Sequence, residues 1–187
     1  RFRTEQIFWG MENRKLLVFV ITFLTALALR PAFAYEISTH ANLTEAVFDF
    51  YNKKFPNQKV SEEYKDKLVA GSKEEDDAPR WLYHFYDPVN NRGLTWNKQK
   101  WLASKYWAQD KKEQTVWASN RFFAQVLGQE PIVYTWQRAI KAYQDGDKET
   151  AFLVLGHILH LLEDVAVPDH TRNDPHPINS PYEEFTE

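Results

Sequence analysis

The chain of 187 residues contains no cysteine. This absence excludes disulfide scaffolds, thiolate-bound zinc, iron–sulfur clusters and thiol nucleophiles. The formal net charge is only −3, so the composition also lacks the excess of basic residues expected of a surface that coats nucleic acid. Any metal that the protein binds must therefore be held by histidine, by carboxylates or by main-chain groups.

The remaining composition is that of a folded globular chain, with 43% hydrophobic, 26% charged and 16% aromatic residues. The N-terminal region has no apolar run long enough to cross a bilayer, because Leu16–Leu29 covers fourteen residues and a spanning helix needs roughly 20. Basic Arg14 and Lys15 precede that run, and Ala32-Phe33-Ala34 follows it. This order is typical of a secretory signal peptide, with an uncleaved N-terminal anchor as the alternative.

We therefore interpret residues 1–10 as translated sequence upstream of the start and residues 11–34 as the signal peptide. The mature chain is expected to begin at Tyr35, to occupy residues 35–187 and to be secreted or periplasmic.

Apolar periodicity and helix-breaking residues predict helices throughout the mature region. The predicted helical segments are 42–55, 61–70, two stretches within 97–127, then 132–144 and 148–165. The apolar stripe of the first consists of Leu43, Val47, Phe50 and Tyr51. The second is expected to end at Gly71, and irregular chain is expected from there to Thr95. Because no βαβ alternation or internal repeat is present, we predict an all-α, single multi-helix domain.

Candidate metal ligands gather on the last predicted helix. His157, His160 and Asp164 share one helical face, and His170 follows shortly after Pro168. A single histidine on an apolar helix is usually a core residue with a hydrogen-bond partner. Two histidines and an aspartate without partners would cost several kcal/mol to bury, so a bound cation is the economical explanation. The H-E-x-x-H motif, paired E-x-x-H motifs and an adjacent His-Asp pair are all absent.

The spacing His160-x3-Asp164-x5-His170 resembles the core motif of the zinc-dependent phospholipase C and single-strand-specific nuclease superfamily. Three further segments are similar to that family's pattern, in the same order. They are Tyr35 with His40, then Gly71, Asp76 and His84 in GSKEEDDAPRWLYHFYDP, and Glu183 in NSPYEEFTE. Family members continue beyond this point, so the resemblance implies a domain truncated at its C-terminus.

The resemblance implies up to three zinc ions. The first would be held by Asp76, His84, His160 and Asp164. The second would be held by the terminal amino and carbonyl groups of Tyr35, by His40 and by a bridging Asp164. The third would be held by His170 and Glu183, with either His176 or Asn179 where the family has a histidine.

Three residues close to these ligands are interpreted separately. Asp76 is preferred to Asp77 from its distance to Gly71, and Glu75 is interpreted as a solvated neighbour. His157 has no ligand counterpart and is expected to support a ligand or to pack in the core.

The implied activity is hydrolysis of a phosphodiester by metal-activated water, with Asp76 orienting or deprotonating that water. The HFYDP segment looks more like the bacterial phospholipase C branch, so the expected substrate is a phospholipid, with transient contact at a membrane surface. Two alternatives stay open. One is a single-strand nuclease that uses the same metals on nucleic acid, and the other is a non-catalytic secreted zinc-binding helical domain.

Overall fold

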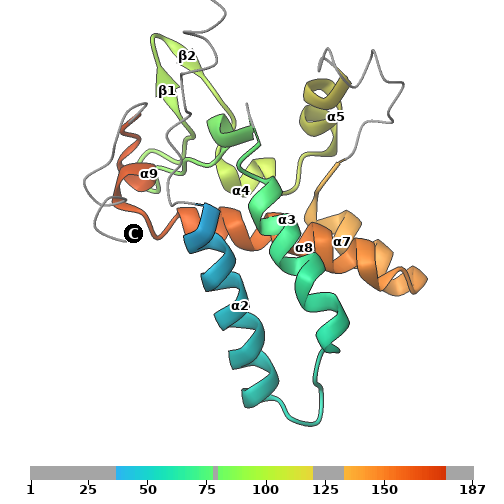
Figure 1. Ribbon diagram of the computed structural model, residues 1–187. Coiled ribbons are helices and arrows are strands. Elements are labelled where there is room, and N and C mark those ends of the chain that lie inside the picture. Colours follow the sequence, from blue (N-terminus) through green and yellow to red (C-terminus); the bar gives the residue numbers. More distant parts are fainter. Residues whose placement is uncertain (1–36, 78–79, 120–132, 176–187) are drawn as a thin grey trace, which may run out of the picture. The chain divides into compact units, whose positions relative to one another are not determined.

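The computed structural model describes residues 37–77, 80–119 and 133–175 (Figure 1). Several sequence predictions lie outside these ranges and are not tested by them. They are the signal peptide and Tyr35, and also His176, Asn179 and Glu183.

The described part of the chain is mostly helical, which confirms the all-α class. Its α-helices are α2 (Ile37–Lys54), α3 (Lys65–Glu74), α4 (Ser104–Trp107), α5 (Lys111–Ser119), α7 (Trp136–Asp145), α8 (Lys148–Asp164) and α9 (Pro168–Arg172). Two 3-10 turns, η1 (Glu62–Tyr64) and η2 (Arg80–Tyr83), and two short strands, β1 (Thr95–Trp96) and β2 (Gln99–Lys100), complete it. Among the described residues, no helix has the length and apolar character needed to cross a membrane.

Helices α4 and α5 are two helical stretches within 97–127, as predicted, and the hairpin β1–β2, which was not predicted, precedes them. Its strands pair antiparallel, with Thr95 opposite Lys100 and Trp96 opposite Gln99. The two residues between the strands, Asn97 and Lys98, have φ angles of 48° and 67°. Positive φ at both central positions is the requirement of a two-residue hairpin turn, which these two residues therefore form.

Helices α7 and α8 confirm that helices occupy most of 132–144 and 148–165, although α7 begins only at Trp136. Side chains and a glycine cap their ends. The side chain of Thr135 accepts a hydrogen bond from the amide of Arg138 at the start of α7. Gly146 ends α7 in the left-handed region, with φ of 87°. Asp147 then accepts from the amide of Thr150 and starts α8.

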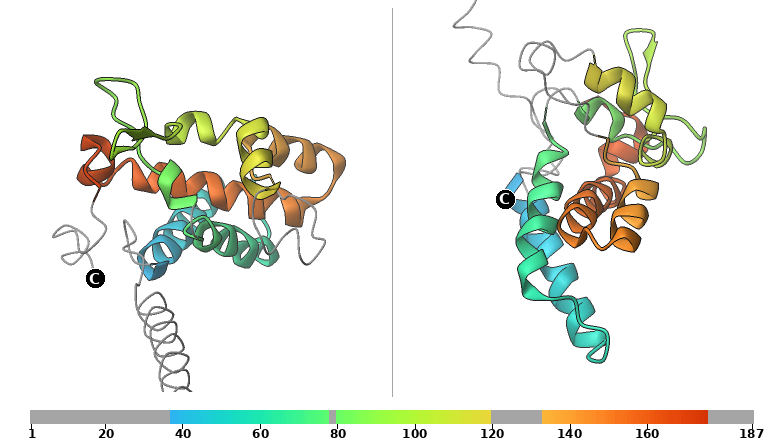
Figure 2. Two further views of the ribbon diagram at one scale, coloured as in Figure 1. Left: turned by 90° about the horizontal axis from the view of Figure 1, so that it is seen from above. Right: turned by 90° about the vertical axis from the view of Figure 1, so that its right-hand side faces the viewer.

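Helix α8 packs against α2, α3 and α7, as Figures 1 and 2 show in three views. The closest approach is to α3. A Cβ atom added to Gly71 would lie 1.9 Å from the carbonyl oxygen of Leu153, and one added to Gly156 would lie 2.0 Å from that of Leu68. Gly71 therefore stands inside α3, which continues to Glu74, and the prediction that it ends the helix is wrong. Here glycine allows two helix backbones to touch.

The buried face of α2 is the polar one. His40, Thr44, Phe48 and Asn52 are buried, whereas the predicted apolar stripe is exposed. Phe50, for example, is 66% exposed and Val47 is 45% exposed. The inward polar groups have partners, since Asn52 both donates to and accepts from the main chain of Val60, at 2.9 and 2.8 Å.

Candidate metal centre

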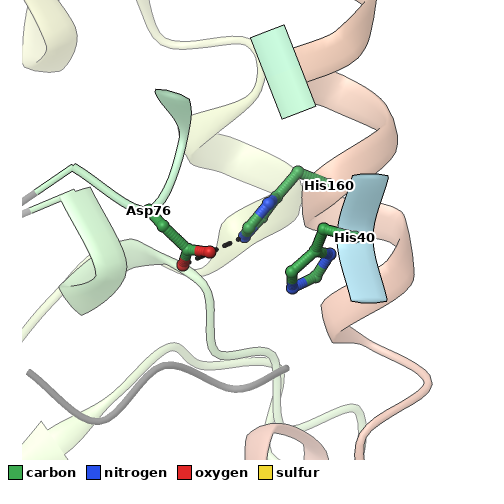
Figure 3. Close-up of side chains that lie close together, drawn as sticks. All are labelled: His40, Asp76 and His160. Carbon is green, nitrogen blue, oxygen red and sulfur yellow. Dashed lines mark ion pairs between the residues drawn. The ribbon is translucent and has the colours of Figure 1, made fainter. Parts of the chain in front are cut away.

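Six sequence-predicted ligands are brought together from five places in the fold. Helix α8 supplies two of them one turn apart, and α2 and α9 supply one each. The other two follow α3 and η2. The residues are His40, Asp76, His84, His160, Asp164 and His170, and all are buried. The close-up in Figure 3 shows three of them, His40, Asp76 and His160, converging from separate elements.

Asp164 stands at the centre of this group. Its Oδ2 lies 2.7 Å from Nδ1 of His84 and 3.2 Å from Nε2 of His160. Its Oδ1 lies 3.5 Å from Nε2 of His40 and 3.6 Å from Nδ1 of His170. Each oxygen of this one carboxylate thus faces two imidazoles, which is the placement that a carboxylate bridging two cations requires.

Asp76 completes the group from the opposite side. Its Oδ1 is 3.5 Å from Nε2 of His160, the ion pair drawn in Figure 3. The ligand atoms of His40, Asp76 and His160 lie within 4.8 Å of one another, and so do those of His84, His160 and Asp164. Either set of three could hold a metal ion.

Two of the histidines are oriented through the ring nitrogen that faces away from the centre. Nδ1 of His160 is 2.7 Å from the main-chain carbonyl of Ser72, and Nδ1 of His40 is 2.7 Å from Oε2 of Glu163. A carbonyl oxygen only accepts, so Nδ1 of His160 carries the proton and its Nε2 can act as a ligand. Hydrogen bonding of the outer nitrogen to a carbonyl or carboxylate is the usual arrangement around metal-binding histidines.

Glu163 is a functional residue that sequence reasoning missed. It also accepts a hydrogen bond from the hydroxyl of Thr44, at 2.9 Å, so two residues of α2 bind one side chain of α8. Glu163 and His40 are 123 positions apart, and only the adjacency of Glu163 to Asp164 hinted at its place.

The charges of the buried histidines and aspartates in this cluster depend on one another. Burial lowers the pKa of His40, but the neighbouring carboxylates of Asp164 and Glu163 outweigh burial and raise that pKa to about 10. Burial likewise opposes the charge on His160, and Asp164 and Asp76 raise its pKa. Burial opposes the charge on Asp164, yet His160, His170 and His84 hold its pKa well below the usual range. For Asp76, burial dominates and raises the pKa.

A cation fits this donor set. Both carboxylate oxygens of Asp76 and of Asp164 are buried and accept no hydrogen bond, although imidazole nitrogens lie near them. Leaving four buried carboxylate oxygens without donors is costly unless a cation compensates them. Imidazole nitrogens and carboxylate oxygens are ligands that divalent transition metals accept.

The predictions for the residues beside the ligands were confirmed in one case and wrong in another. Asp76 lies in the cluster, whereas Asp77 is exposed. Glu75 is fully buried, so its interpretation as a solvated neighbour is wrong. Burial raises the pKa of Glu75, but Arg80 and His157 outweigh burial and hold that pKa well below its ordinary value.

His157 is also buried, and it contacts Glu75 and not the central cluster.

Comparisons with protein-family models, with curated proteins and with solved structures find no match for this chain. The case for function therefore stands on the chain's own residues.

Proposed function

We propose that the protein is a secreted or periplasmic zinc-dependent phosphodiester hydrolase of the phospholipase C type. One observation carries the proposal: six buried imidazole and carboxylate side chains converge, and the oxygens of Asp76 and Asp164 have no hydrogen-bond donor. Zinc suits a cysteine-free set of histidines and carboxylates. The order of the motifs along the sequence, which resembles that of the zinc-dependent phospholipase C superfamily, supports the same assignment.

The residues divide into three sets around Asp164. Asp76, His84 and His160 would hold the first ion together with Asp164, and His40 would hold the second with Asp164 and the terminal groups of Tyr35. The third set comprises His170 and Glu183, with His176 or Asn179. Zinc ions, when bound, supply positive charge to a phosphodiester and lower the pKa of water.

The chain's own contribution to the reaction centres on Asp76. Its two oxygens accept no hydrogen bond, so one of them remains available to orient a water molecule or to accept its proton. Asp164 lies between the imidazoles and would fix the spacing of the first two sites. Burial of every described ligand excludes bulk water, which strengthens each of these electrostatic contacts.

A phospholipid is the proposed substrate, and the exposed side of α2 supports this choice. Val47, Phe50 and Phe55 are each at least 45% exposed, and Lys53 and Lys54 stand in the last turn of the helix. Apolar side chains beside lysines suit transient contact with an anionic lipid surface. Sedimentation with vesicles that contain anionic lipid tests this contact, with F50S as the variant that should weaken it.

The activity is tested on the exported protein. We expect N-terminal sequencing to give Tyr35 first, metal analysis to find zinc, and lipid micelles to release phosphocholine. D76N should abolish that release while zinc is retained in part. Release of acid-soluble nucleotides from single-stranded nucleic acid, without phosphocholine release, would instead identify a nuclease. Bound zinc with neither activity would identify a non-catalytic domain.

A further inference from the structure

A buried ion pair with its own hydrogen-bond network lies beside the metal cluster. Glu75 has no exposed surface, and Arg80 donates to its Oε2 through Nε, at 2.9 Å, and through Nη2. Nδ1 of His157 is 2.6 Å from the same oxygen, and Nε1 of Trp107 donates to Oε1 at 2.9 Å. The negative charge of Glu75 is thus compensated by the protein itself and does not need a metal.

Each charged or imidazole member of this network stands close in sequence to one ligand of the first proposed metal site. The pairs lie at the end of α3, at the turn η2 with the residue that follows it, and on helix α8. Since the members of each pair are separated by no more than about one turn of helix, holding the network together also holds the three ligands. The pairs are Glu75 with Asp76, Arg80 with His84, and His157 with His160.

Aromatic rings and the main chain fix the position of Arg80. Its guanidinium lies 5.1 Å from the ring centroids of both Trp107 and Tyr134. Tyr134 also stacks on His157, with ring centroids 3.6 Å apart. The amide of Arg80 donates to the main-chain carbonyl of Asp77 at 2.8 Å. Arg80 therefore connects the residues after α3 to η2 through both its side chain and its main chain.

The network and the metal cluster differ in what balances their charges. The carboxylate oxygens of Asp76 and Asp164 accept no hydrogen bond, whereas those of Glu75 face three donor side chains. A network that is complete without metal can form as the chain folds, before an ion binds. Ligands that are already in place lose less conformational freedom when the ion arrives, and this strengthens binding.

We propose that the ion pair of Glu75 and Arg80, together with His157, preassembles the first metal site. Arg80 is the positioning residue in this arrangement. It ties η2 to the end of α3 and so sets the distance between Asp76 and His84. This inference rests on the proposed metal centre, and it gives Arg80 a task that involves contact with neither metal nor substrate.

Zinc affinity of the exported protein, measured by chelator competition, tests this role. We expect R80Q to weaken zinc binding by about 10- to 100-fold, because the ion must then order its own ligands. R80K keeps the charge but not the two-nitrogen contact with Glu75, so it should bind zinc more tightly than R80Q. N52A is the matched control, since it loses two hydrogen bonds to Val60 outside the network and should keep wild-type zinc affinity. A folded R80Q protein with wild-type zinc affinity would overturn the proposal.

Amide hydrogen exchange of the metal-free protein separates preassembly from general stability. The amides of Asp77 and Arg80 donate to the carbonyls of Glu74 and Asp77, at 3.1 and 2.8 Å. We expect both amides to be protected in the wild type and in N52A without zinc. In R80Q they should exchange rapidly without zinc and become protected when zinc is saturating. Rapid exchange of both amides in the metal-free wild type would show that metal orders this segment, and preassembly would be wrong.

The exchange measurement on the wild type needs no variant, so the proposal can fail even where a variant does not fold. R80Q leaves Glu75 buried without its arginine, which can prevent folding. The double variant E75Q/R80Q removes both charges of the pair and then takes its place, with the same expected losses of zinc affinity and amide protection.

Failure of this inference differs from failure of the proposed function. If wild-type protein binds no zinc, the proposed function is wrong, and amide exchange still decides whether Arg80 orders the residues after α3. If wild-type protein binds zinc and the folded variant binds it equally well, the positioning role is wrong and the proposed function stands.

Discussion

The contact between α3 and α8 should control metal affinity, and Gly156 is the residue that tests it. A Cβ atom at this position would lie 2.0 Å from the carbonyl oxygen of Leu68, 2.8 Å from the amide nitrogen of Ser72 and 3.0 Å from the Cα of Gly71. All three atoms belong to backbone, so no side chain can rotate away. Ordinary contact begins near 3.4 Å, and G156A therefore requires the two helices to separate by about 1.4 Å at this point.

A larger distance between α3 and α8 would also displace the metal ligands, because these lie on or next to both helices. His160 lies one helical turn beyond Gly156, and its Nδ1 bonds to the carbonyl of Ser72 at 2.7 Å. Asp76 follows α3 directly. Metal–ligand distances tolerate errors of roughly 0.2 Å, far less than the expected separation. We expect G156A to cost about 1–3 kcal/mol of stability through overpacking and to weaken zinc binding by about 10- to 100-fold.

Urea unfolding of the metal-free protein and chelator competition for zinc measure the two effects separately. G146A is the matched control, because Gly146 has φ of 87° and open space around its added Cβ. That variant should lose about 1 kcal/mol from backbone strain and keep wild-type zinc affinity. Wild-type zinc affinity in G156A would refute the argument that helix spacing sets the site.

Three further predictions concern the surroundings of the ligands. E163Q should weaken the binding of one zinc ion by about 10-fold, measured by metal titration, because Glu163 orients His40 through Nδ1. In metal-free protein the pKa of His40 is raised from 6.5 to about 10, so its charge stabilises the fold fully below pH 6.5 and this contribution disappears as pH rises from 6.5 to 10. Urea unfolding midpoints of the wild type and of H40Q across that pH range test whether this stabilisation is lost as the pH rises. N52A should cost about 1–3 kcal/mol in urea unfolding because it removes both hydrogen bonds to Val60.

The parts of the fold that could be predicted from sequence are those set by local chemistry. Asp147 and Gly146 mark the boundary between α7 and α8 because capping and a left-handed residue act within one turn. His160 and Asp164 could be placed on one face from helical spacing alone. Asp76 and His84 could be predicted only through the family resemblance, since no periodicity relates residues on separate elements.

The residues that could not be predicted depend on distant partners. Glu75 reads as one acid in the run KEEDD, and only Arg80, Trp107 and His157 in three dimensions make it a buried anion. Glu163 likewise needs α2 to lie beside α8 before it meets His40. The hairpin turn at Asn97 and Lys98 was not predicted, because both residues adopt positive φ, which neither residue type requires.

Helix α2 shows why apolar periodicity misleads close to a polar centre. Its apolar stripe predicts burial of Val47 and Phe50, yet the buried face carries His40, Thr44 and Phe48 at spacings of four. Glu163 accepts hydrogen bonds from this face, and Asp164 lies against it, so turning the helix to bury Phe50 would leave two carboxylates of α8 without their α2 partners. An uncompensated buried charge costs more than one exposed aromatic ring, which burial stabilises by about 1.5–3 kcal/mol. The cluster that binds metal in our proposal therefore also determines which face of α2 is buried.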